Sequence, residues 1–152
     1  MSIDARLEEL GIELPEAAAP VAAYVPVVID GRRAYVSGQL PFVNGQLVKG
    51  RLGENVPLED GVAAARACGL MILAQLKAAL GSLDRVERVI KLGAFVSSTG
   101  DFDAQPKIAN GASELMADVF GDAGKHARSA VGVPVLPLGA AVEVDAIVAI
   151  RD

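Results

Sequence analysis

The segment Leu58–Leu80, LEDGVAAARACGLMILAQLKAAL, is the stretch of sequence that decides the fold. Its polar residues Glu59, Arg66 and Lys77 fall within about 40° of one another on a helix, and nearly all the remaining surface is apolar. Gly81 follows directly, where helices commonly end on a glycine. The pattern predicts one long helix that lies against a sheet.

Two more helices are expected on either side of this segment. Downstream, Pro106–Phe120 has Pro106 in its first turn and Gly121 at its end. Upstream, Ser2–Leu10 begins with a capping serine and forms the core of an N-terminal helical extension over residues 1–17. The apolar residues of the downstream helix recur at helical spacing, at Ile108, Ala112, Leu115, Met116 and Val119.

Strand-like runs fill the spaces between the helices. Tyr24–Ile29 and Ala34–Gly38 flank Asp30-Gly31, a strong hairpin signal, and Pro26 favours an edge position for the first of them. Three further strands are expected, at Arg85–Ser98, about Arg128–Val133 and Ala140–Ile150.

The order of these elements predicts an α+β fold with two layers. Two long helices cover one face of a mixed sheet, and residues 1–152 form a single domain. In the last strand Val142, Val144, Ala146, Val148 and Ile150 take one face, while Glu143 and Asp145 lie on the other. Such a sheet keeps a bare second face, which another subunit can cover.

Composition narrows the class of protein. Hydrophobic residues make up 52% of the chain, which reflects either burial of apolar surface between subunits or the high alanine content, which adds little apolar area. The net charge is −5 and the pI about 4.9, with no basic run, which disfavours nucleic-acid partners. The start of the chain carries acidic residues where a signal peptide would be apolar, and no membrane span is expected. We therefore expect a soluble cytoplasmic protein.

The single cysteine, Cys68, lies within the apolar pattern of the long helix. We interpret it as a small buried hydrophobic residue rather than a reactive thiol, because a reactive thiol needs an electropositive and partly exposed setting.

The residues that could carry chemistry gather near the end of the chain. The run HARS at residues 126–129 contains Arg128, and Glu143 lies on the next predicted strand. If those two strands pair as a hairpin about Leu136-Pro137, Arg128 lies opposite Glu143. From spacing alone the two form either an ordinary cross-strand ion pair or two parts of a binding site.

Two blocks of sequence resemble the RidA/YjgF family. ARS at residues 127–129, LP at 136–137 and VEVDAI at 142–147 look like the family signature P-A-R-S, L-P and E-I-E-A-I. Upstream, Tyr24 and then YVSGQLP at residues 35–41 resemble its Y-V and SGQ-P block, with matching separation. The similarity covers roughly residues 18–150.

The resemblance implies a chorismate mutase-like (YjgF-like) fold, assembled as a homotrimer whose three sheets form a central barrel. Ligand clefts then lie between neighbouring subunits. The implied activity is hydrolytic deamination of reactive enamine and imine intermediates of the 2-aminoacrylate type to 2-keto acids and ammonia. The enzyme class is that of 2-iminobutanoate/2-iminopropanoate deaminases.

The resemblance also assigns roles to residues. Arg128 would grip the substrate carboxylate, and Glu143 would position or deprotonate the attacking water. Gly38 would bring backbone groups close to the ligand, and Tyr24 would line the cleft. No metal and no organic cofactor is expected, because hydrating an imine needs only positioning and proton transfer.

The sequence departs from the family pattern at several positions. Ala130 stands where many relatives carry a cysteine, and His126 where proline is usual. The region between Phe102 and Phe120 is longer than in short members, which leaves a role for Asn110 open. These departures point to a divergent subgroup. The alternative function is a non-catalytic keto-acid-binding or regulatory trimer, and endoribonuclease activity is disfavoured by the acidic charge.

Overall fold

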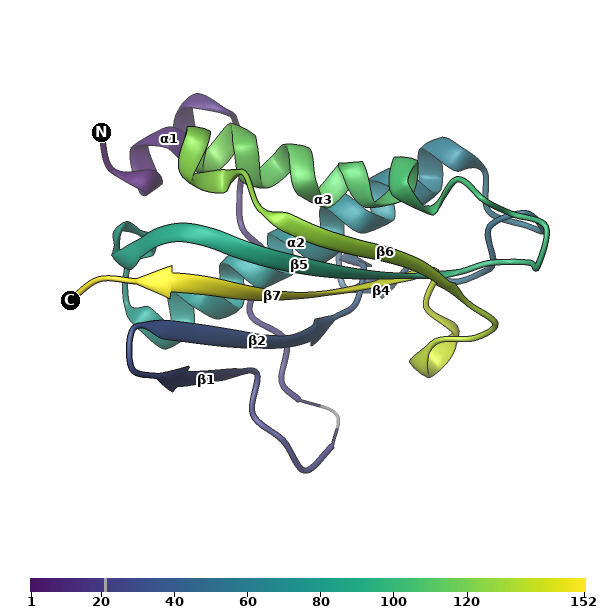
Figure 1. Cartoon of the computed structure of the whole chain (residues 1–152), viewed down its shortest axis with the longest axis horizontal. Helices are drawn as coiled ribbons and strands as arrows, with labels where there is room; N and C mark the ends of the chain where they lie inside the picture. Colours follow the sequence, from purple (N-terminus) through teal and green to yellow (C-terminus); the bar gives the residue numbers. More distant parts are fainter. Residues whose placement is uncertain (21) are drawn as a thin grey trace.

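A computed structural model of the chain describes residues 1–20 and 22–152. Its main sheet is mixed and has the strand order β1-β2-β7-β5-β6, with the long helices α2 and α3 stacked on one face (Figure 1). This is the two-layer α+β fold predicted from the sequence. The strands are β1 (Val27–Asp30), β2 (Arg33–Gln39), β5 (Val86–Ser97), β6 (Ala127–Val133) and β7 (Val142–Ile150).

Helix α2 spans Leu58–Leu80, as its sequence pattern predicts, and ends at Gly81 with φ of 83°. Helix α3 (Gln105–Phe120) begins one residue before the predicted start. The two helices approach so closely that a Cβ on Gly111 of α3 would overlap the carbonyl oxygen of Val62 in α2. The region where they cross therefore requires a glycine.

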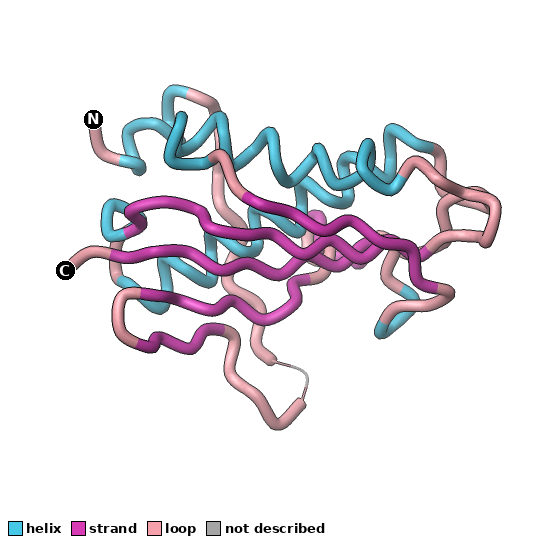
Figure 2. Tube along the Cα trace, viewed as in Figure 1, coloured by secondary structure: helices cyan, strands magenta, loops and turns pink. Residues whose placement is uncertain are grey.

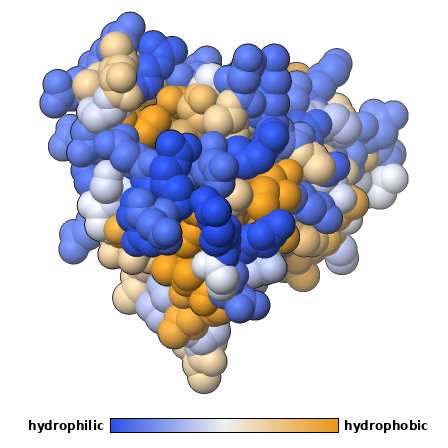
Figure 3. Space-filling view, turned by 60° about the vertical axis from the view of Figure 1, so that its left-hand side comes forward, coloured by the Kyte–Doolittle hydropathy of each residue, from blue (hydrophilic) through white to orange (hydrophobic). Residues whose placement is uncertain are grey.

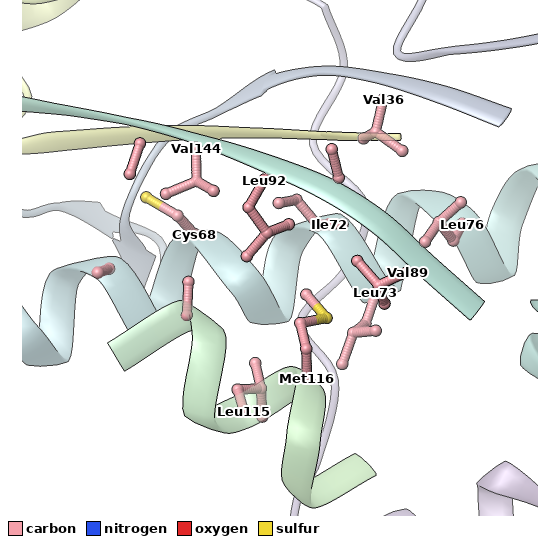
Figure 4. Close-up of a cluster of buried hydrophobic side chains, with 14 of the residues drawn as sticks. Val36, Cys68, Ile72, Leu73, Leu76, Val89, Leu92, Leu115, Met116 and Val144 are labelled. Atoms are coloured by element: carbon pink, nitrogen blue, oxygen red, sulfur yellow. The ribbon is translucent and has the colours of Figure 1, made fainter. Parts of the chain in front are cut away.

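The core lies between the helices and the sheet (Figure 4). Cys68 is fully buried there, and its Sγ lies 3.6 Å from the carbonyl oxygen of Val142. Burial raises the pKa of the Cys68 thiol, so the side chain behaves as a small hydrophobic residue. The same core cluster contains Ile72, Leu73, Leu76, Val89, Leu92, Leu115, Met116 and Val144.

Helix α2 is also long and apolar enough to cross a membrane by length and composition. In this fold 61% of its most apolar window is buried inside the domain, which is the pattern of a core helix.

The short helix α1 (Ile3–Glu9) lies on the helical layer. Ser2 caps it by accepting a hydrogen bond from the amide of Ala5, as the sequence indicates. Arg6 Nε donates to the carbonyl oxygen of Asp118 in α3 at 2.9 Å, so the extension is fastened to the second long helix.

Loops and a small hairpin complete the domain (Figure 2). The hairpin joins β3 (Phe42–Val43) to β4 (Gln46–Leu47) through Asn44 and Gly45, which both have positive φ. Three short 3₁₀ turns, Leu83–Arg85, Gly121–Gly124 and Pro137–Gly139, connect the other elements.

The expected hairpin between the last two strands is wrong. β6 pairs in parallel with β5, and β7 pairs antiparallel with both β5 and β2. The chain between β6 and β7 passes around the end of β5, where the Ser97 amide donates to Ala141 O and the Ser98 amide to Val133 O. β5 is twelve residues long and offers hydrogen-bonding groups on both edges, so it separates the two strands.

Candidate functional site

Arg128 lies on β6, at one edge of the sheet. It is level with Leu92 of β5, which is buried against the helices, so the Arg128 side chain is on the helical side of the sheet. Its Nη1 donates to Asn110 Oδ1 at 2.8 Å and to Ser113 Oγ at 3.1 Å. Both acceptors come from α3 at positions i and i+3, which share one face of the helix.

His126 extends this hydrogen-bond network. Its Nε2 lies 2.9 Å from Ser113 Oγ, and its Nδ1 lies 2.6 Å from the carbonyl oxygen of Gly124. Strand β6 begins directly after His126, and the turn Gly121–Gly124 ends just before it. The imidazole is therefore fixed at both nitrogens.

Arg128, Ser113 and His126 line an open cavity of about 490 Å³ at the edge of the sheet. Within the described part of the chain, Nε and Nη2 of Arg128 have no hydrogen-bond partner, and this planar edge matches the two oxygens of a carboxylate. The cavity is lined by Ser113, Glu114, Ala117, Lys125, His126 and Arg128.

Glu143 occupies the other face of the sheet. The residues on either side of it, Val142 and Val144, are fully buried on the helical face, as the alternation of β7 predicts. The Glu143 carboxylate packs against Gly38 of β2, where any Cβ would overlap its Oε2 atom. Gly38 is thus required for this contact, in a stretch where the β2–β7 register is irregular.

The pKa of Glu143 is raised, first because burial strips water from the carboxylate and second because the charge of Asp145 lies nearby. The pKa of Asp145 is also raised by burial, against a hydrogen bond from the Gly93 backbone and the charge of Lys91. A carboxylate with a raised pKa is a stronger base than a solvated one.

Tyr24 and Gly38 line one small cavity of about 40 Å³ together with Gln39 and Gln75. Gln75 Nε2 of α2 donates to Ala18 O at 2.6 Å and to Gln39 Oε1 at 3.3 Å. Gln39 Nε2 in turn donates to Ser37 O at 2.9 Å. The buried glutamines therefore link the backbone just before Gly38 to the segment at Ala18.

The four predicted site residues fall into two groups. Gly38 and Glu143 are in contact, and Tyr24 shares a cavity with Gly38. Arg128 is separated from Glu143 by β5, lies three positions away in register, and points to the opposite face. The expected cross-strand alignment of Arg128 with Glu143 is therefore wrong for a single protomer. We call Arg128 and the side chains that hold it the arginine half-site, and Tyr24, Gly38 and Glu143 the glutamate half-site.

Sequence reasoning missed several residues of these half-sites. Asn110, whose role the sequence leaves open, contacts Arg128 directly, and so does Ser113, which no sequence motif indicates. Their spacing of three on a predicted helix was the available signal. Gln75 was identifiable as an amide within the apolar surface of the long helix.

Two other kinds of site are relevant, namely a metal site and a further cavity. No group of three metal-ligating side chains occurs within residues 1–20 and 22–152. A cavity of about 730 Å³ lies between residues 13–18, the β3–β4 hairpin and α2, and it shares Ala18, Phe42 and Met71 with the small cavity at Tyr24 and Gly38. It is lined mainly by apolar side chains such as Leu14, Phe42 and Met71.

Comparison with known proteins gives consistent matches. Residues 4–149 match the family described as "YjgF/chorismate_mutase-like, putative endoribonuclease". Protein TCP17 of Trypanosoma cruzi is 52% identical over 152 residues, covering 99% of this chain and 95% of that protein. The solved structure of Atu1372 from Agrobacterium tumefaciens, of unknown function, is 50% identical with a TM-score of 0.91, covering 98% and 92% of the two chains.

Two further structures differ in how closely they superpose on this chain. An endoribonuclease-like protein of Shewanella oneidensis MR-1 superposes with a TM-score of 0.95 at 35% identity, covering 99% and 100% of the two chains. TdcF of E. coli reaches a TM-score of 0.63 at 25% identity, covering 90% of this chain and 94% of that one. The geometry of this chain is thus closer to the former.

Proposed function

Because the chain belongs to the YjgF/RidA family of chorismate mutase-like proteins, we propose that it hydrolyses reactive enamine and imine intermediates to 2-keto acids and ammonia. The substrates carry a carboxylate, as 2-aminoacrylate does. The observation that carries the proposal is the free Nε and Nη2 edge of Arg128, which opens on the edge cavity. The E. coli relative TdcF is described with bound serine, itself an α-carboxylate, which supports this class of ligand.

The proposed active site is a cleft between subunits of a homotrimer. The arginine half-site lies at the β6 edge, and the glutamate half-site lies toward the β1–β2 edge. A head-to-tail ring brings unlike edges of neighbouring subunits together, so Arg128 of one subunit meets Gly38, Tyr24 and Glu143 of the next. One protomer cannot assemble such a site from its own residues.

Exposed apolar side chains at both edges support this assembly. Figure 3 shows apolar surface, in orange, interleaved with hydrophilic side chains and continuing toward the loop that precedes β1. Exposed large hydrophobic residues gather at the two edges, namely Tyr24, Val25, Val28, Ile29 and Tyr35 at one and Val131, Val135 and Leu138 at the other. Contact between subunits would remove both sets from water.

The chemistry needs a carboxylate clamp and a base. An enamine first takes a proton on carbon and becomes the iminium ion, the protonated imine. Glu143 then accepts a proton from water as the water oxygen adds to the C=N carbon, which gives a carbinolamine. Glu143 returns that proton to the nitrogen, the hydroxyl group loses its proton as the C=O bond forms, and the C–N bond breaks to release ammonia. Arg128 neutralises the substrate carboxylate and holds the reacting carbon in place.

A second candidate function is keto-acid binding without turnover. It is favoured by Ala130, which packs against the core two residues after Arg128 and has no polar group to hold a water. In that case the arginine half-site still binds a carboxylate, and Glu143 does not take part in proton transfer.

The experiment generates the imine in place with threonine dehydratase and follows its loss and the release of ammonia. We expect wild type to accelerate the loss and Arg128→Ala to lose this acceleration. Lys107→Ala removes the same charge from an exposed position on α3 and serves as the matched control. No acceleration by wild type, with 2-oxobutanoate still bound through Arg128, would leave the binding function in place of the deaminase.

A further inference from the structure

Arg128 is held by a chain of polar groups whose direction can be read atom by atom. The carbonyl oxygen of Gly124 can only accept a hydrogen bond, so the His126 nitrogen that lies 2.6 Å from it, Nδ1, carries a proton. In the neutral imidazole Nε2 is then the acceptor, and the Ser113 hydroxyl at 2.9 Å must donate to it. The lone pairs of Ser113 Oγ are left to accept from Arg128 Nη1 at 3.1 Å.

We propose that Ser113 and His126 are positioning residues that aim the free Nε and Nη2 edge of Arg128 at the substrate carboxylate. The proposal rests on the carboxylate-binding role proposed for Arg128. Asn110 and Ser113 together occupy Nη1, which fixes the rotation of the guanidinium about its long axis. His126 acts one step further back by fixing the orientation of the Ser113 hydroxyl.

This arrangement gives His126 a function that the sequence alone did not assign. The residue precedes the signature arginine by two positions, where proline is usual in the family resemblance described above. Proline there could neither accept from Ser113 nor donate to Gly124. We call the chain of hydrogen bonds from Gly124 through His126 and Ser113 to Arg128 the relay, and we expect it only where a histidine occupies this position.

The charged groups near the imidazole are Glu114 of α3, which lies on the same cavity, and Lys125 and Arg128 on its own segment. Lys125 forms an ion pair with Asp122 at 3.0 Å and is directed to solvent. Charges of both signs lie near His126 and would all affect a pH profile. The hydrogen bonds themselves therefore give the clearer test of the relay.

The first test reads the tautomer in the ligand-free protein. His126 is the only histidine, so its ring nitrogens give a single set of ¹⁵N NMR signals. We expect a protonated Nδ1 and an unprotonated Nε2 at mildly alkaline pH, the reverse of the tautomer that free imidazole side chains favour. An Nε2-protonated ring, or a rapidly exchanging mixture, would overturn the relay.

The second test is a double-mutant cycle on binding of 2-oxobutanoate, measured by calorimetry. Ser113→Ala should weaken binding about tenfold, since a hydrogen bond to a charged group is lost, and Ser113→Thr should restore it. His126→Leu should weaken binding several-fold in the wild-type background and have no further effect in Ser113→Ala. Additive effects of the two substitutions would contradict a relay.

The two proposals fail separately. If Arg128→Ala binds 2-oxobutanoate as wild type does, the proposed function fails whatever the tautomer is. If Arg128→Ala loses binding while Ser113→Ala keeps it, the positioning inference is overturned and the role of Arg128 stands. Thermal unfolding of each variant checks that Ser113→Ala, on a half-buried helix position, retains its fold.

Discussion

Arg128 is held in place by the hydrogen bonds that it donates to Asn110 and Ser113 of α3, whereas Glu143 is held by close packing against a glycine. The arginine half-site stays open to solvent and keeps one edge of the guanidinium free. The glutamate half-site is partly dehydrated and raises the pKa of its carboxylate. One half therefore suits recognition of an anion, and the other suits proton transfer.

The largest effect is expected when the two half-sites are inactivated on different chains. Arg128→Ala and Glu143→Gln should each lower kcat/KM for imine hydrolysis by about 100-fold or more, because each removes one half. Unfolding and refolding the two variants together should restore activity. In randomly mixed trimers about one quarter of the clefts combine an intact arginine with an intact glutamate.

The measurement is ammonia release from the mixture, beside each variant refolded alone. Recovery near one quarter of wild-type activity supports a cleft shared between subunits. A mixture no more active than its components would mean that both residues act within one protomer, against their positions on opposite faces of the sheet.

A smaller effect is expected from Gly38→Ala. The new Cβ would overlap Glu143 Oε2, so the carboxylate must move and kcat should fall about 10- to 100-fold. Binding of 2-oxobutanoate through Arg128 should stay close to wild type by calorimetry. Gly100→Ala is the matched control, because nothing lies within 4 Å of a Cβ at that position. Equal loss of binding and turnover would show that Gly38 supports both halves.

The smallest effect is a shift in pH dependence. The charge of Asp145 raises the pKa of Glu143, so Asp145→Asn should lower it. The acid limb of the kcat/KM profile should then move to lower pH, by less than about one unit. Arg128→Lys, which changes the other half-site, should lower kcat/KM without moving this limb. An acid limb that stays in place in Asp145→Asn would exclude Glu143 as the titrating base.

Much of the fold could be predicted because its periodicity is strong. Helix α2 has the bounds that its apolar surface and Gly81 indicate, and the alternation of β7 correctly placed Glu143 away from the core. The sequence predicts a hairpin of β6 with β7, because strands that are neighbours in sequence often pair, and this prediction is wrong. The parallel β5–β6 ladder depends on a long-range choice that local patterns do not encode.

The candidate site was predicted as a set of residues but not as an arrangement. The Glu143 carboxylate packs directly against Gly38, and the spacing of the motifs does not reveal this contact. Ser113 could not be identified from the sequence, because a serine on a helix is usually solvated. Its role depends on Arg128 and His126, which reach it from another part of the chain. Contacts between elements far apart in sequence fix chemistry that composition and spacing leave open.

The central place of β7 has a consequence for biosynthesis. β7 lies between β2 and β5 in the sheet, although it follows both of them in the chain. Until it emerges, β2 and β5 lack a shared neighbour, and the apolar faces of α2 and α3 lack part of the surface that covers them. The sheet can therefore close only once β7 has been synthesised, and the apolar helix α2 stays partly uncovered until then.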